Sequence, residues 1–314
     1  MFIRHGVLMA AHHSSGKLAL VPPFSPAATP HLHITYGKGY ILGHCYDPAE
    51  DKLYILTARA RSCWLYVHSL AEDASPRTRS VSVQGMADFG NGCPLWRVEM
   101  ASVGGRVYLF GSPSFFQDDP RLICLDAWDS ASSVIRAQVI RHFADSQSFK
   151  PISLVVSDEQ HQDECVLCVV YCDRSEGWVY QRLSVIHRGG KVSSVCSGSW
   201  PLRGHGPMVM EYRLLRRNLL LVRVSKDEDG MVYSHSLCDE RGHDLGMARA
   251  QRTPLEATQT LIADDGTIYI KSGGRQSAVD CVHAFYTQAR QLTDRKTSTW
   301  FFAAKSRHTN PDEV

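Results

Sequence analysis

The sequence predicts an all-β fold, a β-propeller of about six short sheets. Short runs of β-branched and aromatic residues fill the 314-residue chain, and clusters of Gly, Asp, Asn, Ser or Pro bound them. Strands and hairpins show this pattern. Similar runs recur at intervals of roughly 50 residues, which is typical of a propeller. One small sheet cannot bury both of its faces, but sheets packed face to face around an axis cover one another.

Three kinds of apolar run repeat in a fixed order. The central run lies at 18–21, 53–56, 107–110, 166–170, 219–222 and 268–270. A run at 40–42, 96–98, 152–155, 208–210 and 260–262 precedes it, and one at 64–70, 122–125, 178–183, 231–237 and 281–285 follows it. Turn sequences at 50–52, 104–106, 216–218 and 264–266 favour the positive φ angles of tight hairpins.

The repeats divide the chain into sheets over 2–37, 38–90, 91–145, 146–202, 203–252 and 253–304. The first is short, with strands expected at 17–21 and 31–36, and we expect it to lack an outer strand. Residues 299–304 are predicted to fill that gap, so that N- and C-terminal strands close the ring. One domain is therefore expected over 1–304, followed by a polar tail at 305–314. Helical patterns are weak, at 287–295 and at 130–142, where a strand fits equally well.

Composition places the chain among globular proteins. Hydrophobic residues make up 44% and charged residues 21%, which excludes wholesale disorder. The formal net charge is +2, without the basic excess typical of nucleic-acid binding. Arg213, Arg216 and Arg217 are interpreted as part of a solvated hairpin. No run is long enough to predict a membrane span.

The expected location is intracellular, in cytoplasm or nucleus. The ten cysteines are spread along the chain, mostly in apolar runs, which indicates a reducing compartment. The apolar run at 6–11 is too short for a secretory signal core. The absence of acidic residues before Asp47, with basic Arg4, Lys17 and Lys38, leaves organellar import open.

Two repeats resemble those of kelch-like propellers. Residues 104–111 and 265–274 are similar to the kelch pattern of a strand beside paired glycines. The resemblance implies the propeller architecture for most of the chain. A seven-bladed WD40-like propeller is the alternative, and small WD40 proteins of this length imply an adaptor that docks segments of larger partners.

No catalytic, cofactor-binding or metal-ligating residue is assigned. Cys165, Cys168 and Cys172 have a zinc-like spacing, but an odd spacing places the first two on opposite faces of a strand. His31 and His33 share a face near His12 and His13, so convergence on a metal stays open. The histidines that an axial site would gather are His12, His31, His33, His44 and His205.

Acidic pairs and aromatic residues are interpreted structurally. Asp264–Asp265 and Asp118–Asp119 lie between strands, where Asp serves turns. The residues 189–191 are predicted to form a turn. Most tryptophans, and the repeated Tyr66, Tyr180 and Tyr233, are expected to pack between sheets. The tryptophans are Trp64, Trp96, Trp128, Trp178, Trp200 and Trp300.

The expected function is a non-catalytic protein-interaction scaffold or adaptor subunit that docks partner segments on a propeller face. The expected contact loops are 71–78, 112–120 and 158–164, because loops on a rigid frame carry recognition. One or more proteins, in a stable complex, are the expected partners, with no membrane, nucleic acid, cofactor or small-molecule substrate. The alternatives are a propeller hydrolase or lyase with a central-channel site, and a glycan- or nucleic-acid-binding propeller.

Overall fold

The structure, a computed structural model, consists almost entirely of β-strands. It describes residues 2–4, 7–14, 17–21, 32–37, 39–71, 78–90, 98–112, 120–126, 132–143, 153–161, 163–201, 209–215, 218–227, 230–238, 244–247, 257–262, 267–272, 279–284 and 302–305. Beyond residue 201 the description covers the backbone. Within these ranges, no helix is long and apolar enough to cross a membrane.

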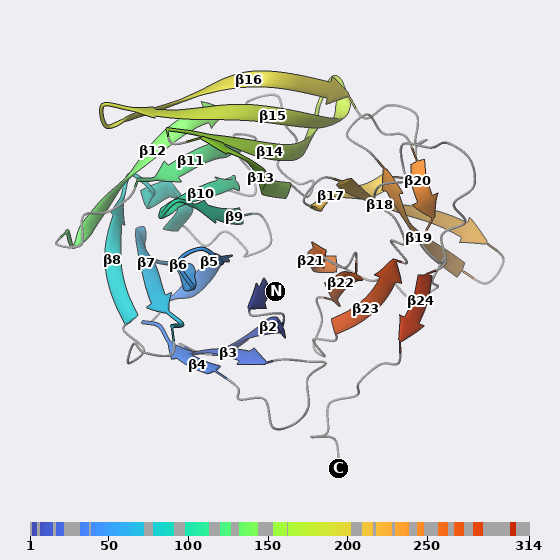
Figure 1. The fold of residues 1–314 in the computed structure, drawn as a ribbon, viewed down its shortest axis with the longest axis horizontal. Coiled ribbons are helices and arrows are strands. Elements are labelled where there is room, and N and C mark those ends of the chain that lie inside the picture. The colour runs from blue at the N-terminus through green and yellow to red at the C-terminus, as the bar shows by residue number, and fades with distance from the viewer. Residues whose placement is uncertain are drawn as a thin grey trace, which may run out of the picture. The chain divides into compact units, whose positions relative to one another are not determined.

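The strands of the described residues form five sheets. Four sheets each contain four consecutive strands, and the fifth contains two such groups, which gives six groups of four. Figure 1 labels these strands. The first two groups are β1 (Phe2–Arg4), β2 (Val7–Ser14), β3 (Lys17–Val21), β4 (Leu32–Thr35), and β5 (Tyr40–Asp47), β6 (Lys52–Arg59), β7 (Ser62–Ser69), β8 (Thr78–Gln84). The next two are β9 (Val98–Val103), β10 (Arg106–Gly111), β11 (Arg121–Leu125), β12 (Val134–His142), and β13 (Ser153–His161), β14 (Glu164–Asp173), β15 (Gly177–Arg188), β16 (Lys191–Pro201). The last two are β17 (Val209–Leu215), β18 (Asn218–Asp227), β19 (Gly230–Cys238), β20 (Asp244–Met247), and β21 (Ala257–Ile262), β22 (Thr267–Ser272), β23 (Val279–Ala284), β24 (Phe302–Lys305). A 3-10 helix, η1 (Ala87–Gly90), follows β8.

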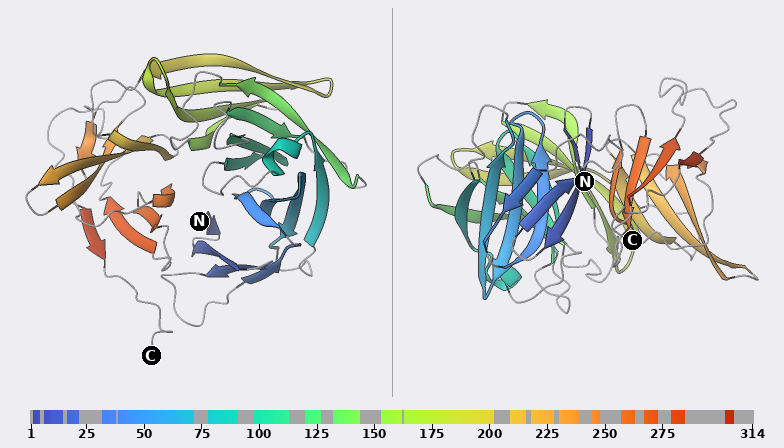
Figure 2. Two further views of the ribbon diagram at one scale, coloured as in Figure 1. Left: turned by 180° about the vertical axis from the view of Figure 1, so that it is seen from behind. Right: turned by 90° about the horizontal axis from the view of Figure 1, so that it is seen from below.

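The chain divides into two compact units. One contains residues 1–14, 18–33 and 204–314, and the other contains 15–17 and 34–203. The second, called here the central unit, holds β5–β16, and Figure 2 shows its strands from two further directions. The single domain over 1–304 and the tail over 305–314 stay predictions, although Lys305 itself belongs to β24.

Two apolar cores in the central unit lie on the two faces of the β9–β12 group. Val107 and Leu109 of β10 join a core with residues of β5–β8. The alternate residues Tyr108 and Phe110 join a second core with β13, β14 and β15. Because successive side chains of a strand point to opposite faces, one strand contributes to both cores. Face-to-face packing of consecutive sheets is therefore confirmed for this unit.

Two of the four predicted hairpin turns, at 50–52 and 104–106, lie among the described residues, whereas 216–217 and 264–266 lie outside them. Asp51, Gly104 and Gly105 have φ angles of 46°, 58° and 74°, so the left-handed conformation expected at these two turns is confirmed. The 189–190 turn joins β15 and β16 in the same way, with φ angles of 59° and 74° at its glycines.

Three expectations about individual strands are wrong. The first group has four strands of its own, because residues 2–4 and 7–14 pair as β1 and β2. The C-terminal strand does not complete that group: β24 pairs antiparallel with β23, with Val282 opposite Ala304. The loop expected at 158–164 is mostly hairpin, since β13 runs to His161 and β14 starts at Glu164. Its polar side chains favoured a loop, but polarity does not prevent backbone pairing.

The weak helical pattern at 130–142 resolves as a strand, since β12 covers Val134–His142. The other helical pattern, at 287–295, lies outside the described residues.

Candidate functional site

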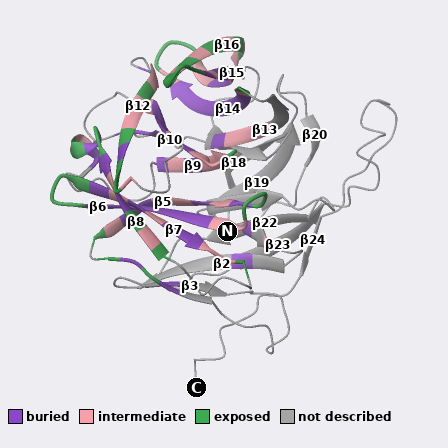
Figure 3. Cartoon of the chain, turned by 60° about the vertical axis from the view of Figure 1, so that its left-hand side comes forward, coloured by how far each residue is buried: buried purple, intermediate pink, exposed green. Residues whose placement is uncertain are grey.

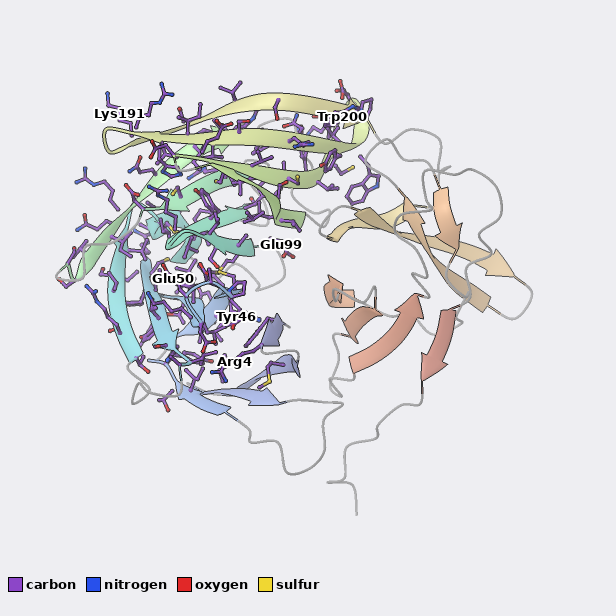
Figure 4. All side chains as sticks on the ribbon, viewed as in Figure 1. Arg4, Tyr46, Glu50, Glu99, Lys191 and Trp200 are labelled. Atoms are coloured by element: carbon purple, nitrogen blue, oxygen red, sulfur yellow. The ribbon has the colours of Figure 1, made fainter. Side chains whose placement is uncertain are left out.

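The strand β16 forms the outer edge of the β13–β16 sheet in the central unit. Gly189 and Gly190 allow β15 to turn back into β16, an eleven-residue strand at the end of the sheet order. Among the described residues, no strand pairs with its outer side. Figure 4 labels Lys191 and Trp200 at its two ends. Figure 3 shows exposed and half-buried residues along β16 and buried residues along β14, and β15 lies between these two strands in the sheet order.

Exposure alternates along β16. Lys191, Ser193, Val195, Ser197 and Ser199 are exposed, and the residues between them are half-buried. The residue Val195 is 57% exposed, against 42% for Val139 and 40% for Val134, the other exposed large aliphatic residues in the described part of the chain. β16 thus offers an unpaired backbone edge with an aliphatic side chain at its centre.

The outer strands of the two preceding groups protect each other. β8 and β12 pair in parallel, with Val134, Ile135 and Arg136 opposite Ser82, Val83 and Gln84. The Ser82 amide donates to the Ser133 carbonyl oxygen at 3.1 Å, and the Arg79 guanidinium donates to the Ser132 carbonyl oxygen. This pairing joins eight strands into one sheet and covers edges that would otherwise stay open.

Unpaired strand edges favour association, because a row of free N–H and C=O groups can pair with another strand. Folded proteins protect such edges with charges, proline, bulges or a covering segment. β16 has a bulge opposite Arg182–Leu183 and one charge at its start, and its only proline is the last residue. Its middle portion therefore remains open to pairing.

A buried polar network joins the β9–β12 group to the β13–β16 sheet. The Tyr108 hydroxyl lies 2.7 Å from His187 Nε2, and the Cys165 thiol donates to the Tyr108 oxygen at 3.2 Å. Burial raises the pKa of Tyr108 and lowers the pKa of His187, so both groups are neutral and a hydrogen bond joins the hydroxyl and Nε2. The side chains are enclosed, and their role is to hold the two sheets in register.

A buried carboxyl, Asp47, closes the β5–β6 turn. Its Oδ1 accepts the backbone N–H groups of Ala49 and Glu50 at 3.0 and 3.3 Å. Its Oδ2 is buried without a hydrogen-bond partner. Burial raises the pKa of Asp47, because desolvation disfavours the charged form more than the two N–H groups stabilise it. Asp47 therefore stabilises the backbone of the turn, a role that aspartate commonly has.

The cysteines of the zinc-like spacing separate as predicted. Cys165 faces the core shared with Tyr108, whereas Cys168 faces the other side of β14 and accepts a hydrogen bond from the Tyr180 hydroxyl at 3.2 Å. Cys172 is buried at the far end of that strand. Among the described residues, no three His, Cys, Asp or Glu side chains gather as a metal site would require.

The histidines are placed only in part. His12 and His13 lie on β2 and His33 on β4, with β3 between these strands in the sheet order. His44 lies half-buried on β5. His31 and His205, like both acidic pairs at 118–119 and 264–265, lie outside the described residues, so convergence of the histidines stays a prediction.

The aromatic residues of the central unit lie at the sheet faces. Tyr180 is buried, with its ring 5.4 Å from the Trp200 ring, and Tyr66 is half-buried, 6.3 Å from the Tyr36 ring. Trp64 and Trp178 are half-buried. Tyr233 is described only as part of the β19 backbone. Trp96, Trp128 and Trp300 lie outside the described residues, as do most of the predicted contact loops 71–78 and 112–120.

Of the three arginines interpreted as part of a hairpin, Arg216 and Arg217 lie outside the described residues. β17 and β18 pair antiparallel on either side of residues 216–217, with Leu215 opposite Asn218, and Arg213 belongs to β17.

The open β16 edge was not predicted. The serine and valine residues of 191–201, with a single charge, do indicate a strand that is exposed on one face. The sequence pattern does not reveal whether another strand covers the edge.

No protein-family model matches the sequence, and no curated protein matches it. Solved structures do match. A provisionally assigned 6-phosphogluconolactonase from Bacteroides uniformis superposes with a TM-score of 0.52 at 8% identity, over 93% of this chain and 77% of that one. A Lactobacillus plantarum protein gives 0.49 at 10% identity over the same shares, and a structure named the Dos1 propeller gives 0.43 at 11% identity, over 93% and 66%.

The fold is an all-β propeller. Consecutive four-stranded groups, the face-to-face cores of the central unit and the first of these likenesses support the same class. At 8% identity the likeness shows the fold alone. Kelch-like or WD40-like membership, and the number of blades, stay predictions.

Proposed function

We propose that this protein is a non-catalytic interaction scaffold, an adaptor subunit that docks segments of partner proteins. The observation that carries the proposal is the open outer edge of β16, with Val195 57% exposed at its centre. The neighbouring outer strands β8 and β12 cover each other, so the same unit contains both the protected arrangement and an unprotected one. An open edge of eleven residues fits a surface that a partner covers.

The proposed partners are one or more proteins in a stable intracellular complex. The described cysteines Cys45, Cys63, Cys124, Cys165, Cys168, Cys172 and Cys196 are free thiols. These free thiols support the proposal of a reducing compartment, cytoplasm or nucleus, because oxidising compartments favour disulfides.

The test is affinity purification of the tagged full-length protein from native extract. We expect a stoichiometric protein partner that is retained by the wild type and by a Val134→Lys control, and lost with Val195→Lys. Both valines are exposed, so neither change should affect folding by more than about 0.5 kcal/mol. The control lies in a strand whose outer edge is already paired. Recovery of the chain alone, at low salt, contradicts the scaffold and favours the propeller-enzyme alternative.

A further inference from the structure

We propose that β16 binds an extended, acidic segment of a partner protein as an added strand. In this arrangement the acidic residues of the segment lie near Arg188 and Lys191, and an aliphatic side chain lies beside Val195. The proposal rests on the scaffold function and deepens it, since it names the class of partner and the way it binds.

The charged residues of the β15–β16 hairpin are all basic. Residues 177–201, which form β15, β16 and their turn, contain Arg182, Arg188 and Lys191 and no Asp or Glu. The whole chain is nearly balanced, with 34 Lys and Arg against 32 Asp and Glu. A hairpin of this length without an acidic residue is therefore a local departure from the average, and it favours an acidic ligand.

A third basic residue lies close to the β15–β16 turn. The Gln138 side-chain amide donates to the Gly190 carbonyl oxygen at 3.4 Å, which places the middle of β12 beside the turn. Arg136 lies two residues before Gln138, and therefore on the same face of β12. Arg136, Arg188 and Lys191 are all exposed. We call these three residues the basic turn.

The side chains of β16 define what an added strand would meet. Residues directly opposite one another on neighbouring strands have their Cβ atoms about 5 Å apart and interact on the same face. The exposed face of β16 presents Ser193, Val195 and Ser197. An aliphatic residue beside Val195 buries the apolar surface that is now exposed, and small polar residues fit beside the serines. The free backbone groups of β16 supply the hydrogen bonds.

An acidic peptide fits this surface better than nucleic acid or a second copy of the chain. Affinity for duplex nucleic acid comes mainly from neutralising many phosphates, on the order of 6–10 in a strongly salt-dependent complex, and the basic turn offers three exposed cations. Neither an exposed valine nor an unpaired strand edge contributes to phosphate binding. A second copy paired through its own β16 contributes the same hairpin, which carries basic residues and no Asp or Glu.

The test uses the full-length protein and synthetic peptides. The probe is a peptide of about nine residues that alternates valine and threonine and ends in two glutamates. One control replaces the glutamates with lysines, a second carries N-methyl groups at alternate amides, and a third probe is single-stranded DNA. Binding is followed by fluorescence anisotropy, and the site by amide hydrogen exchange.

We expect the glutamate peptide to bind and to slow exchange within residues 192–200. The lysine peptide should bind at least about tenfold more weakly, since two exposed ion pairs become repulsive, and the N-methylated peptide should not bind. The double variant R188E/K191E should reverse the preference between the two charged peptides. The Val134→Lys variant should bind as the wild type does.

Several results overturn strand addition. Unchanged exchange in residues 192–200, equal binding of the two charged peptides, or retained binding of the N-methylated peptide each contradict it. DNA binding that exceeds peptide binding and disappears with R188E/K191E assigns the basic turn to a polyanion instead. If purification recovers a partner that R188E/K191E and Val195→Lys both retain, strand addition fails while the scaffold stands. If the peptide binds as expected and no partner is recovered, the scaffold fails while strand addition stands.

Discussion

Replacement of Tyr108 by phenylalanine tests the network that joins two sheets of the central unit. Tyr108 is fully buried in β10, and its hydroxyl lies between His187 Nε2 at 2.7 Å and the Cys165 sulfur at 3.2 Å. Phenylalanine keeps the ring and removes the hydroxyl. His187 Nε2 then loses its hydrogen-bond partner.

The cost follows from that unpaired ring nitrogen. A buried polar group that loses its partner costs about 1–3 kcal/mol, and the weak thiol donor adds little. We therefore expect Tyr108→Phe to lower the free energy of unfolding of the central unit by about 2 kcal/mol. The matched control is Tyr66→Phe, because the half-buried Tyr66 hydroxyl makes no hydrogen bond with the described residues, and its loss should cost less than about 0.5 kcal/mol.

Urea unfolding followed by tryptophan fluorescence measures this difference. Of the six tryptophans, all but Trp300 fall within residues 34–203, so the signal reports mainly on the central unit. The midpoint should shift while the slope is unchanged.

Adding His187→Leu to Tyr108→Phe removes both hydrogen-bonding partners. The loss in the double variant should therefore be smaller than the sum of the single losses. Additive losses, or a Tyr108→Phe variant as stable as the control, refute the network.

Three other measurements probe the same unit. Leu109→Ala in the core between β5–β8 and β9–β12 should lower the unfolding free energy by about 2–5 kcal/mol, whereas Val139→Ala at an exposed position should change it by less than about 0.5 kcal/mol. Similar losses for these two variants would argue against the packed sheets. Burial lowers the pKa of His68 to about 4, so the folded state binds fewer protons than the unfolded state between pH 6.5 and 4. Stability should fall by up to about 3 kcal/mol as the pH drops through that window, and a pH profile that His68→Leu leaves unchanged would disprove this origin. Gly105→Ala should destabilise the β9–β10 hairpin by roughly 1–2 kcal/mol, because the φ angle of Gly105 is 74° and the new Cβ would lie 3.2 Å from Glu50 Oε1. Gly105→Asn should cost less, because asparagine tolerates the left-handed conformation better than alanine. Equal melting curves for both variants and the wild type would contradict the left-handed turn.

Strand positions were largely predictable because they follow from local patterns. The apolar runs at 53–56, 107–110 and 166–170 each lie inside a strand of the structure, namely β6, β10 and β14. The ranges 38–90, 91–145 and 146–202 each contain one group of four strands. Opposite orientations of Cys165 and Cys168 also followed from spacing alone, because side chains alternate along any strand.

Strand partners were less predictable. Nothing in residues 299–304 indicates whether they join the first sheet or the last, since any apolar strand can pair with any open edge. β24 pairs with β23, and β1 and β2 supply the strands that the first sheet was expected to lack. Residues 158–161 extend β13 although they are polar, because backbone pairing does not require apolar side chains.

The open edge of β16 was unpredictable for the same reason as the strand partners. The sequence determined that residues 191–201 are compatible with a strand, that their charge is basic, and that a tight glycine turn precedes them. Only the tertiary structure decided that β8 and β12 cover each other's edges while β16 remains open. The physical reason is that side-chain pattern specifies which face of a strand is buried, whereas the hydrogen bonds at its edge come from backbone groups that every residue shares.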